Sequence, residues 1–288
     1  MILVTGATGT VGSEVVAQLV AAGQEVRAMT RNPTKARFDG PVELMQGDFA
    51  DPKTLENAVE GAERVFSLTV GPQTGIHERN LAQAAKKAGV RHIVKLSAMG
   101  GDEETRNTIR KWHDEGEQAI REIGIPLTVL RPSAFMSNAL HWRETIRSQG
   151  KVFSNYGDGK LPPIHPRDIA AIAVRALTGD GHEGKAYSMT GPEAMSISEQ
   201  VKILSEAIGR PLEYVAISDE VARKGMTQAG MPLALIDALI PFGGFNPERE
   251  GRGGVSHGRG SDGQAGVDVP GLGAGECGGF SIRSYRRP

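Results

Sequence analysis

The residues most suggestive of chemistry are three glycines close to the start of the chain. Gly6, Gly9 and Gly12 are spaced G-x-x-G-x-x-G, between the apolar run 2–4 and a helical pattern that begins at about Val11. A strand, a glycine turn and a helix are the context of a dinucleotide fingerprint. Gly6 permits the tight turn, Gly9 lets the backbone approach a pyrophosphate, and Gly12 lets the helix pack closely on the strand. The helix N-terminus then offers N–H groups to the phosphates, while the alternative is a glycine turn with a purely structural role.

The end of the second predicted strand bears on the choice of cofactor. Residues 25–31 form this strand, which ends in Thr30-Arg31 without a carboxylate. An acidic side chain there would bind the ribose 2′-OH of NAD. A guanidinium can instead pair bidentately with a 2′-phosphate. The sequence therefore favours NADP(H), and NAD(H) is the alternative if Arg31 only stacks over adenine.

A sheet is needed to position these residues, and the chain predicts one. Apolar strand-like runs alternate with helical segments up to Phe135, which indicates βαβ units and a parallel sheet with right-handed crossovers. We expect an α/β fold with a Rossmann-like doubly wound parallel sheet over residues 1–135. After the first strand and the second at 25–31, the expected strands are 42–48, 64–70, 92–97 and 127–131, with helices near 52–59, 78–88 and 104–122.

Past residue 135 the alternation is less regular, which predicts a small C-terminal substrate lobe over 136–242 with some elements returning to the sheet. Its expected helices are 138–147, 167–177, 198–208, 220–229 and 233–239, its expected strands are 185–190 and 212–217, and 151–163 is expected to be a glycine- and proline-rich loop. Substrate contacts should come from this half of the chain.

The last segment, residues 243–288, has a different character. It contains 14 glycines and almost no apolar periodicity. Such a sequence buries too little apolar surface to offset its ordering entropy, so it predicts a disordered tail. A second hypothesis is a frameshift product, because GC-rich back-translation of 268–280 with a one-base slip allows an amphipathic helix containing a tryptophan.

The composition narrows the class of protein. The chain has 288 residues, 39% hydrophobic content and a net charge of −1, which gives no electrostatic case for nucleic acid or an anionic membrane. It has no membrane-length apolar run, no signal-like start, a single cysteine (Cys277) and no zinc-type Cys/His spacing. We expect a cytoplasmic, metal-free monomer or homodimer that acts on a small molecule.

Several short motifs occur together along residues 1–240. They are T-G-A-T-G-x-V-G at 5–12, Thr30-Arg-Asn-Pro33, Gly47-Asp48, Leu130-Arg131, Gly157-Asp-Gly-Lys160, and Gly181-His-Glu-Gly-Lys185 with Tyr187. This ordered set resembles the NmrA-like branch of the atypical short-chain dehydrogenases/reductases, especially its NADPH quinone oxidoreductases and triphenylmethane dye reductases. The resemblance implies a Rossmann fold and an NAD(P)H-dependent reductase.

The resemblance also implies site residues. The expected cofactor-binding residues are Gly6, Thr8, Gly9, Thr10, Val11, Arg31, Asp48, Phe49, Thr69, Val70, Ser97 and Pro132. The expected substrate-binding residues are Met99, Phe135, Asn138 and Trp142, and these would suit an aromatic substrate, although some of them are equally compatible with ordinary core positions. For Asp48, a bland alternative is that it caps the next helix.

The catalytic dyad of orthodox short-chain dehydrogenases, Tyr-x-x-x-Lys on the helix after strand five, is missing. That helix carries Ile109 and His113 instead, and relatives of this branch have a histidine at the same place. His113 is therefore the candidate catalytic residue, against the alternative of a histidine packed beside Trp112. Tyr156-Gly-Asp-Gly-Lys160 matches the spacing but lies in a glycine loop, so we interpret it as a coincidence. His165 and Asp168 look structural.

Three functions follow from these expectations. The first is an NAD(P)H-dependent oxidoreductase that transfers hydride to a quinone, a dye-like or a polycyclic aromatic acceptor. The alternative from another class is a non-catalytic NAD(P)-sensing regulatory protein of the NmrA type. A sugar epimerase or dehydratase is weaker, because its tyrosine base is missing.

Overall fold

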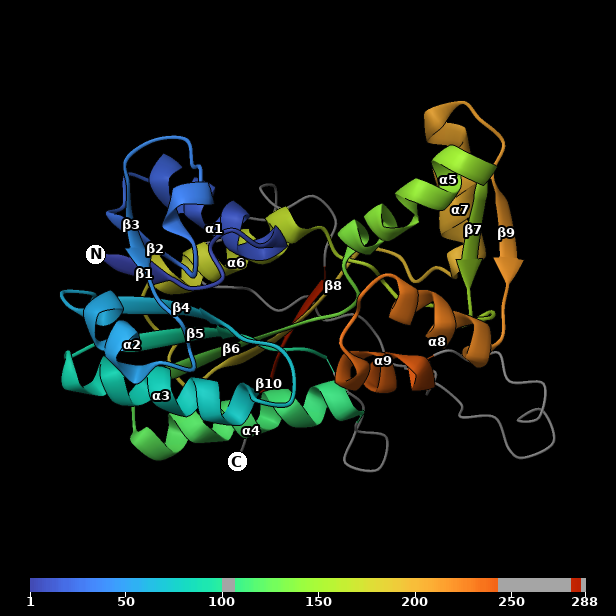
Figure 1. Ribbon diagram of the computed structural model, residues 1–288. Coiled ribbons are helices and arrows are strands. Elements are labelled where there is room, and N and C mark those ends of the chain that lie inside the picture. The colour runs from blue at the N-terminus through green and yellow to red at the C-terminus, as the bar shows by residue number, and fades with distance from the viewer. Residues whose placement is uncertain (100–106, 243–280, 286–288) are drawn as a thin grey trace.

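Seven strands run parallel in one sheet of the computed structural model, which describes residues 1–99, 107–242 and 281–285 (Figure 1). In spatial order they are β8 (Ala186–Thr190), β6 (Leu127–Pro132), β5 (His92–Leu96), β4 (Arg64–Leu68), β1 (Ile2–Val4), β2 (Val26–Thr30) and β3 (Val42–Gln46). The order reverses between β1 and β4, as in a doubly wound sheet. The predicted Rossmann-like α/β class is therefore confirmed.

Helices cover both faces of the sheet (Figure 1). One face carries α1 (Thr10–Ala21) and α6 (Pro166–Thr178), and the other carries α2 (Pro52–Val59), α3 (Thr74–Lys87) and α4 (Thr108–Ile123). Each layer has its own apolar core: Val15, Leu19 and Ile169 belong to the first, and Leu55 and Leu81 belong to the second. These are the helical faces that the spacing of apolar residues predicts.

The lobe lies beyond one end of the sheet, on the right in Figure 1. It contains the 3₁₀ segment η2 (Met136–Trp142), α5 (Arg143–Gln149), β7 (Lys151–Ser154), α7 (Ile197–Ile208), β9 (Glu213–Ala216), α8 (Asp219–Gln228) and α9 (Leu233–Leu239). Short 3₁₀ segments occur at Pro33–Lys35 (η1) and Ile240–Phe242 (η3). Two elements from residues 136–242, α6 and β8, return to the main sheet.

One expectation for the lobe was wrong. Residues 151–163 were expected to form a loop, but their first four residues are β7, which pairs in parallel with β9. Val152 and Ser154 are buried while Lys151 and Phe153 are half-buried, so the strand has the alternation of a sheet with one covered face. Four residues bounded by glycines are too short for that alternation to stand out in the sequence.

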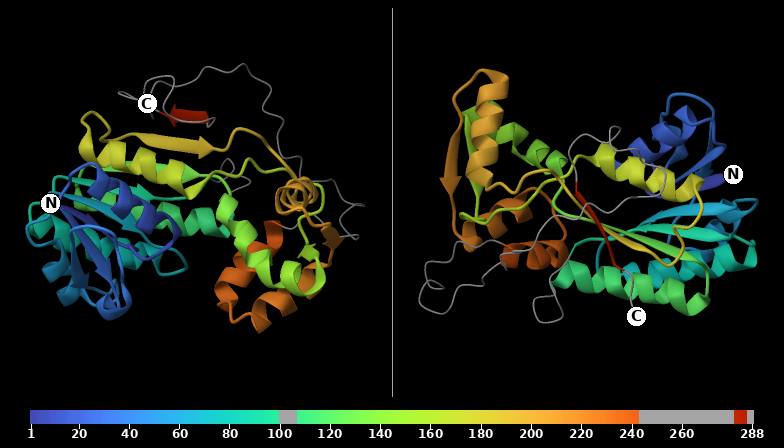
Figure 2. Two further views of the ribbon diagram at one scale, coloured as in Figure 1. Left: turned by 90° about the horizontal axis from the view of Figure 1, so that it is seen from above. Right: turned by 180° about the vertical axis from the view of Figure 1, so that it is seen from behind.

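A second correction concerns Ser281–Tyr285, which the sequence assigned to a structureless tail. These residues form β10, which pairs antiparallel with β8 at the edge of the main sheet; it is the red strand in Figure 2. The rest of the tail, residues 243–280 and 286–288, lies outside the described residues. The disordered-tail and frameshift hypotheses stay predictions for it.

The glycine turn connects β1 to α1 at the point where the strand order reverses. Gly6 has a φ of 60°, in the left-handed region that favours glycine. Gly12 faces the turn so closely that an added Cβ would lie 2.1 Å from the carbonyl oxygen of Gly6. No side chain fits at this approach, so the helix and the turn can keep this spacing only with glycine at both positions.

We predict that Gly12→Ala displaces the turn from α1 and weakens dinucleotide binding more than tenfold, since about 1.4 kcal/mol of lost binding energy already corresponds to a factor of ten. The matched control is Gly23→Ala at the other end of α1, where φ is 69° but no atom lies within 4 Å of the added Cβ. Gly23→Ala carries a backbone cost at its positive φ but crowds nothing, whereas Gly12→Ala crowds the turn. Titration with NADPH distinguishes them, and equal affinities in the two variants would contradict the prediction.

Candidate cofactor and substrate site

The turn after β1 exposes its backbone at the carboxyl edge of the sheet. Thr8, Gly9 and Thr10 are exposed and Val11 is buried. Gly9 is the N-cap of α1 but supplies no side-chain hydrogen bond, and the first turn of the helix has no acidic side chain. The first N–H groups of α1 and its positive dipole end therefore suit a phosphate, which fits the predicted role of these residues.

A buried threonine fixes the turn to the neighbouring strand. The Thr5 hydroxyl donates to the carbonyl oxygen of Phe66 at 3.1 Å and accepts from the N–H of Leu68 at 3.0 Å. Both partners belong to β4, so the hydroxyl ties β1 to β4 where the strand order reverses. Ligands of open α/β sheets bind at this kind of crevice.

Arg31, Asp48 and Phe49 follow the ends of β2 and β3, as expected for the adenosine half of a dinucleotide. Arg31 and Asp48 are exposed. Asp48 Oδ1 accepts from the N–H of Ala50 at 2.9 Å, whereas Asp51 caps α2 through the N–H of Lys53. The alternative that Asp48 caps the next helix was therefore wrong.

Phe49 packs its ring against a histidine of α3. The ring centroids of Phe49 and His77 are 5.8 Å apart, with 28° between the ring planes. The Asn80 side chain donates to the carbonyl oxygen of Phe49 at 2.9 Å, which fixes the backbone of this loop. Phe49 is thus held in place and half-buried, and its cofactor contact stays a prediction.

Exposed apolar side chains lie just after the ends of β4 and β5 and within η2. The exposed fractions are 60% for Val70, 39% for Met99, 39% for Met136 and 67% for Leu140. The loop that carries Met99 is joined to the end of β6, because the N–H of Met99 donates to the carbonyl oxygen of Pro132 at 2.9 Å. Of the other predicted substrate residues, Asn138 is exposed, and Phe135 and Trp142 are half-buried; Phe135 packs against the core of the α1 face.

Beneath this edge lies a buried ion pair between β5 and α3. Lys95 Nζ lies 2.7 Å from Glu78 Oε1, and both side chains are 0% exposed. Glu78 also accepts from the hydroxyls of Ser67 and Thr69, each at 2.7 Å. Lys95 donates further to the carbonyl oxygen of Leu96 at 3.3 Å. The predicted cofactor residue Thr69 is therefore part of this cluster.

A second buried carboxylate, Glu117 of α4, collects three arginines. It pairs with Arg110 at 2.9 Å, Arg131 at 2.7 Å and Arg121 at 3.0 Å, and accepts from the Ser97 hydroxyl at 2.8 Å. Burial alone would raise the pKa of Glu117, but hydrogen bonds from Arg131 and Arg110 and their charges outweigh it and hold the pKa at about 2. Ser97, another predicted cofactor residue, is anchored here.

His113 lies one helical turn before Glu117 on the same face of α4. Its side chain is buried, and Nδ1 has no hydrogen-bond partner among the described residues. Burial, followed by the positive charges of Lys95 and Arg110, lowers the pKa of His113 to about 3. Its imidazole is therefore uncharged at neutral pH, and its catalytic role stays a prediction.

We call these residues the buried polar layer: Ser67, Thr69, Glu78, Lys95, Ser97, Arg110, His113, Glu117 and Arg131. The sequence predicts Thr69, Ser97 and His113 as site residues but not the ion pair of Lys95 and Glu78. One signal was available, because Lys95 is the only charged residue inside the apolar strand Ile93–Leu96. A lysine in a strand covered on both faces needs a buried partner.

The remaining candidates lie elsewhere. Lys160 pairs with Glu199 of α7 at 2.5 Å, and Tyr156 lies in the loop after β7, where burial raises its pKa. His165 caps α6, because its Nδ1 accepts from the N–H of Arg167 at 3.1 Å. The structural interpretation of His165 is thus confirmed.

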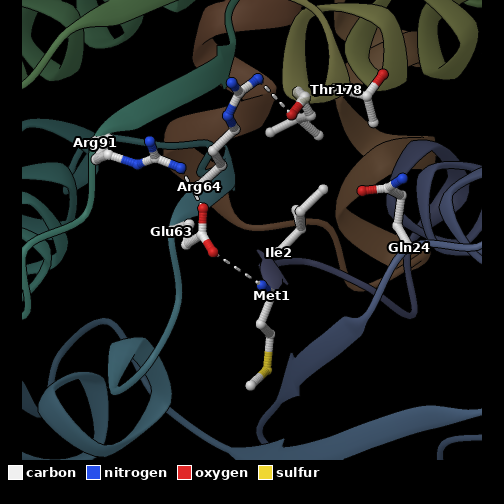
Figure 3. Close-up of a pocket in the computed structure, with 8 residues that line it drawn as sticks. Met1, Ile2, Gln24, Glu63, Arg64, Arg91 and Thr178 are labelled. Carbon is white, nitrogen blue, oxygen red and sulfur yellow. Dashed lines mark hydrogen bonds and ion pairs between the residues drawn. The ribbon is translucent and has the colours of Figure 1, made fainter.

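A polar pocket opens at the opposite, amino edge of the sheet (Figure 3). Its volume is about 220 Å³, and Met1, Glu63, Arg64, Arg91 and Thr178 are among the lining residues. Its charged groups are already paired: Glu63 contacts Arg91 and the amino group of Met1, and Arg64 donates to the carbonyl oxygens at the end of α6. The pocket is therefore explained by contacts within the fold.

Two absences hold for the described part of the chain. None of its helices combines the length and apolar character required to cross a membrane. Within residues 1–99, 107–242 and 281–285, no group of three or more His, Cys, Asp or Glu side chains is arranged to hold a metal ion.

A parallel sheet with this strand order, helices on both faces and a glycine turn after β1 defines the class of Rossmann-like α/β proteins. Residues 1–261 match the model of the NmrA-like family. The chain belongs to that family, as its motifs predict.

Three relatives illustrate the family. The chain is 46% identical over 242 residues to the (4-alkanoyl-5-oxo-2,5-dihydrofuran-3-yl)methyl phosphate reductase of Streptomyces griseus, covering 83% of this chain and 85% of the relative. It is 42% identical to the NAD(P)H azoreductase of Xenophilus azovorans over the same shares. The crystal structure of NADPH-dependent quinone oxidoreductase QOR2 from Escherichia coli, complexed with NADPH, superposes with a TM-score of 0.72 at 28% identity, covering 86% of this chain and 92% of that one.

The buried histidines predict an acid-sensitive fold. Burial lowers the pKa of His92 to about 4, and its Nδ1 has no partner among the described residues. The unfolded chain binds a proton near pH 6.5 and the folded chain does not, so stability is full above that pH and falls until about pH 4. The loss amounts to about 3 kcal/mol for a shift of this size.

The acid-sensitive contribution of His92 can be checked by measuring the free energy of unfolding in urea from pH 8 to pH 4.5. His92→Asn should reduce the loss of stability below pH 6.5 and leave the dependence above pH 7 unchanged. An identical slope in the variant and the wild type at acidic pH would contradict the assignment.

Proposed function

We propose that this protein is an NADPH-dependent reductase that delivers hydride to an electron-poor conjugated or aromatic acceptor, such as a quinone. The observation that carries the proposal is the character of the buried polar layer. It combines predicted cofactor residues with an uncharged His113, and no tyrosine stands at the position of an orthodox dyad. Such a site suits acceptors that need no proton donor during hydride transfer.

The residues present fit a dinucleotide. The uncapped N-terminus of α1 and the close approach of Gly12 to Gly6 leave room for backbone contact with a pyrophosphate. Arg31 stands at the end of β2 without a neighbouring carboxylate on that strand end, which favours a 2′-phosphate. We assign binding to these residues and to Asp48, Phe49, Thr69 and Ser97. When bound, the dihydronicotinamide supplies the hydride.

The relatives support the acceptor class. The name of the first relative describes an unsaturated lactone, the second is an azoreductase and the third is a quinone oxidoreductase. Lactone, azo compound and quinone each have a conjugated, electron-poor π system. The exposed side chains of Val70, Met99 and Met136 offer apolar surface for such a flat molecule. The protein's contribution is then to hold donor and acceptor in hydride-transfer geometry and to exclude water.

We predict that Arg31→Ala weakens NADPH binding by about 1.5–3 kcal/mol, the range for a hydrogen bond to a charged group. NADH lacks the 2′-phosphate, so its affinity should change far less. Fluorescence titration with both cofactors measures the difference. Equal losses for NADPH and NADH would argue against the assignment of Arg31.

We also predict that quinone reduction varies little with pH near neutrality and that simple ketones are poor substrates. A ketone develops an alkoxide and needs a positioned acid, which contributes typically about 10²–10⁴-fold. Tyr156→Phe should leave kcat/KM nearly unchanged. His113→Ala should reduce kcat/KM by less than about tenfold, which is below the contribution of a positioned acid.

The measurement is kcat/KM for a quinone and a ketone from pH 6 to 9 in the wild type and both variants. A hundredfold loss in a folded variant would reveal a missed proton donor. Tight NADPH binding without oxidation by any quinone, azo or lactone acceptor would overturn the reductase and favour a dinucleotide-sensing protein.

A further inference from the structure

We propose that Arg110 is a positioning residue of the acceptor site: it holds the segment 97–99 at the carboxyl edge of the sheet, so that Met99 presents its side chain to the acceptor. The proposal rests on the proposed function, because it concerns how a conjugated acceptor is held. The role of Arg110 is indirect, since its side chain is buried beneath the edge.

The start of α4 fixes the place of the Arg110 guanidinium. Asn107, the N-cap of α4, accepts from the N–H of Arg110 at 2.8 Å, so the backbone of Arg110 is held by the cap. The side chain is only 6% exposed. Its Nη2 donates to Asp114 one turn further along the helix, and its Nη1 donates to Glu117 Oε1 at 2.9 Å. The guanidinium is therefore paired with two carboxylates of its own helix.

From this place the guanidinium reaches the segment that follows β5. Arg110 Nη1 donates to Ser97 Oγ at 2.8 Å and to the carbonyl oxygen of Ala98 at 3.1 Å. The Ser97 hydroxyl in turn donates its one proton to Glu117 Oε1 at 2.8 Å. Ser97 and Ala98 are thus tied to α4 by a side chain that accepts and donates and by a backbone carbonyl.

The other side of the segment is tied to β6. The N–H of Ser97 donates to the carbonyl oxygen of Leu130 at 2.7 Å, and the N–H of Met99 donates to that of Pro132 at 2.9 Å. The segment is consequently held by the sheet through its N–H groups and by α4 through Arg110 and Glu117. Two independent elements fix the backbone from which the Met99 side chain extends.

A fixed backbone matters for a methionine in particular. The Met99 side chain is 39% exposed at the carboxyl edge. It has three rotatable bonds and a polarizable sulfur that makes favourable contacts with aromatic rings. Because such a side chain is flexible, the protein can direct it at an acceptor only by fixing its backbone. Arg110 therefore acts on the acceptor through Met99, whereas the phosphates of the dinucleotide are assigned to α1 and Arg31.

The informative variant is Arg110→Lys. It keeps the positive charge but loses the planar fork that reaches several acceptors at once. Glu117 still has Arg131 at 2.7 Å and Arg121 at 3.0 Å, so its buried carboxylate keeps ionic partners.

The matched control is Arg121→Lys, the same change on the same helix and beside the same carboxylate. Its side chain donates to Glu117, and among the described residues it donates to no atom of the segment 97–99. The two variants therefore differ in whether the contact with the segment is lost.

The first experiment is NMR of the methionine methyl groups in the free protein, with Met99→Leu used to assign the signal of Met99. We expect the Met99 signal to shift or broaden in Arg110→Lys and to stay unchanged in Arg121→Lys. The same Met99 signal in the wild type and in Arg110→Lys would overturn the proposal. No acceptor is needed, so this result is distinguishable from an absence of quinone reduction, which bears on the proposed function.

The second experiment is a double-mutant cycle of Arg110→Lys and Met99→Ala, with menadione as the acceptor. Each single variant should raise the KM for menadione by about three- to tenfold, the range that contacts between sulfur and an aromatic ring span. In the Met99→Ala background, Arg110→Lys should change the KM by no more than about twofold, because both changes remove the same contact. The Kd for NADPH should stay within about twofold in all three variants, which is the accuracy of such cycles.

A role of Arg110 in stability alone gives a different result. It would lower the amount of protein that binds NADPH and leave the KM for menadione unchanged. It would also act equally in the wild-type and Met99→Ala backgrounds. Either an unchanged KM in Arg110→Lys or effects that multiply in the double variant would overturn the proposal.

Discussion

The carboxyl edge of the sheet depends on the ion pair of Lys95 and Glu78. Both side chains are fully buried, and removing one partner of such a pair typically costs about 3–5 kcal/mol because the other charge remains without compensation. The pair is tolerated because Glu78 also receives the hydroxyls of Ser67 and Thr69. It consequently connects β4, β5 and α3 at one point, and α4 closes over that point through Gly116.

The two halves of the candidate site are built from different kinds of contact. At β1 and α1 the contacts come from the backbone, because Gly12 approaches Gly6 too closely for any side chain and the N-cap Gly9 leaves the helix N-terminus uncapped. At β4 and β5 they come from buried polar side chains that hold Thr69 and Ser97. The first arrangement suits phosphates, which are recognised by N–H groups and a helix dipole. The second suits a ring that changes charge, since its surroundings are polar and are held in place by hydrogen bonds and ion pairs.

The difference between the two halves explains what the sequence could predict. The glycine turn is local, so its spacing, the flanking strand and the helix are readable within a dozen residues, and the six strands β1 to β6 follow from the same alternation of strands and helices. The polar layer is not local, because Lys95 and Glu78 are 17 residues apart and Arg131 and Glu117 are 14 apart. Their pairing depends on how α3 and α4 pack on the sheet. The strand β7 was missed for another reason: four residues carry too little alternation to outweigh the glycines and prolines around them.

The polar layer also relates the fold to the class of chemistry. A general acid at this edge would need a group that exchanges a proton near neutral pH, and the described groups that surround His113 act against this. Burial, Lys95 and Arg110 keep its imidazole uncharged, while Arg131 and Arg110 keep Glu117 ionised. Neither group is poised to change its protonation state at pH 7, so the edge provides fixed dipoles and fixed charges. Hydride transfer to a conjugated acceptor needs only such a preorganised environment, because the product can take its proton later from water.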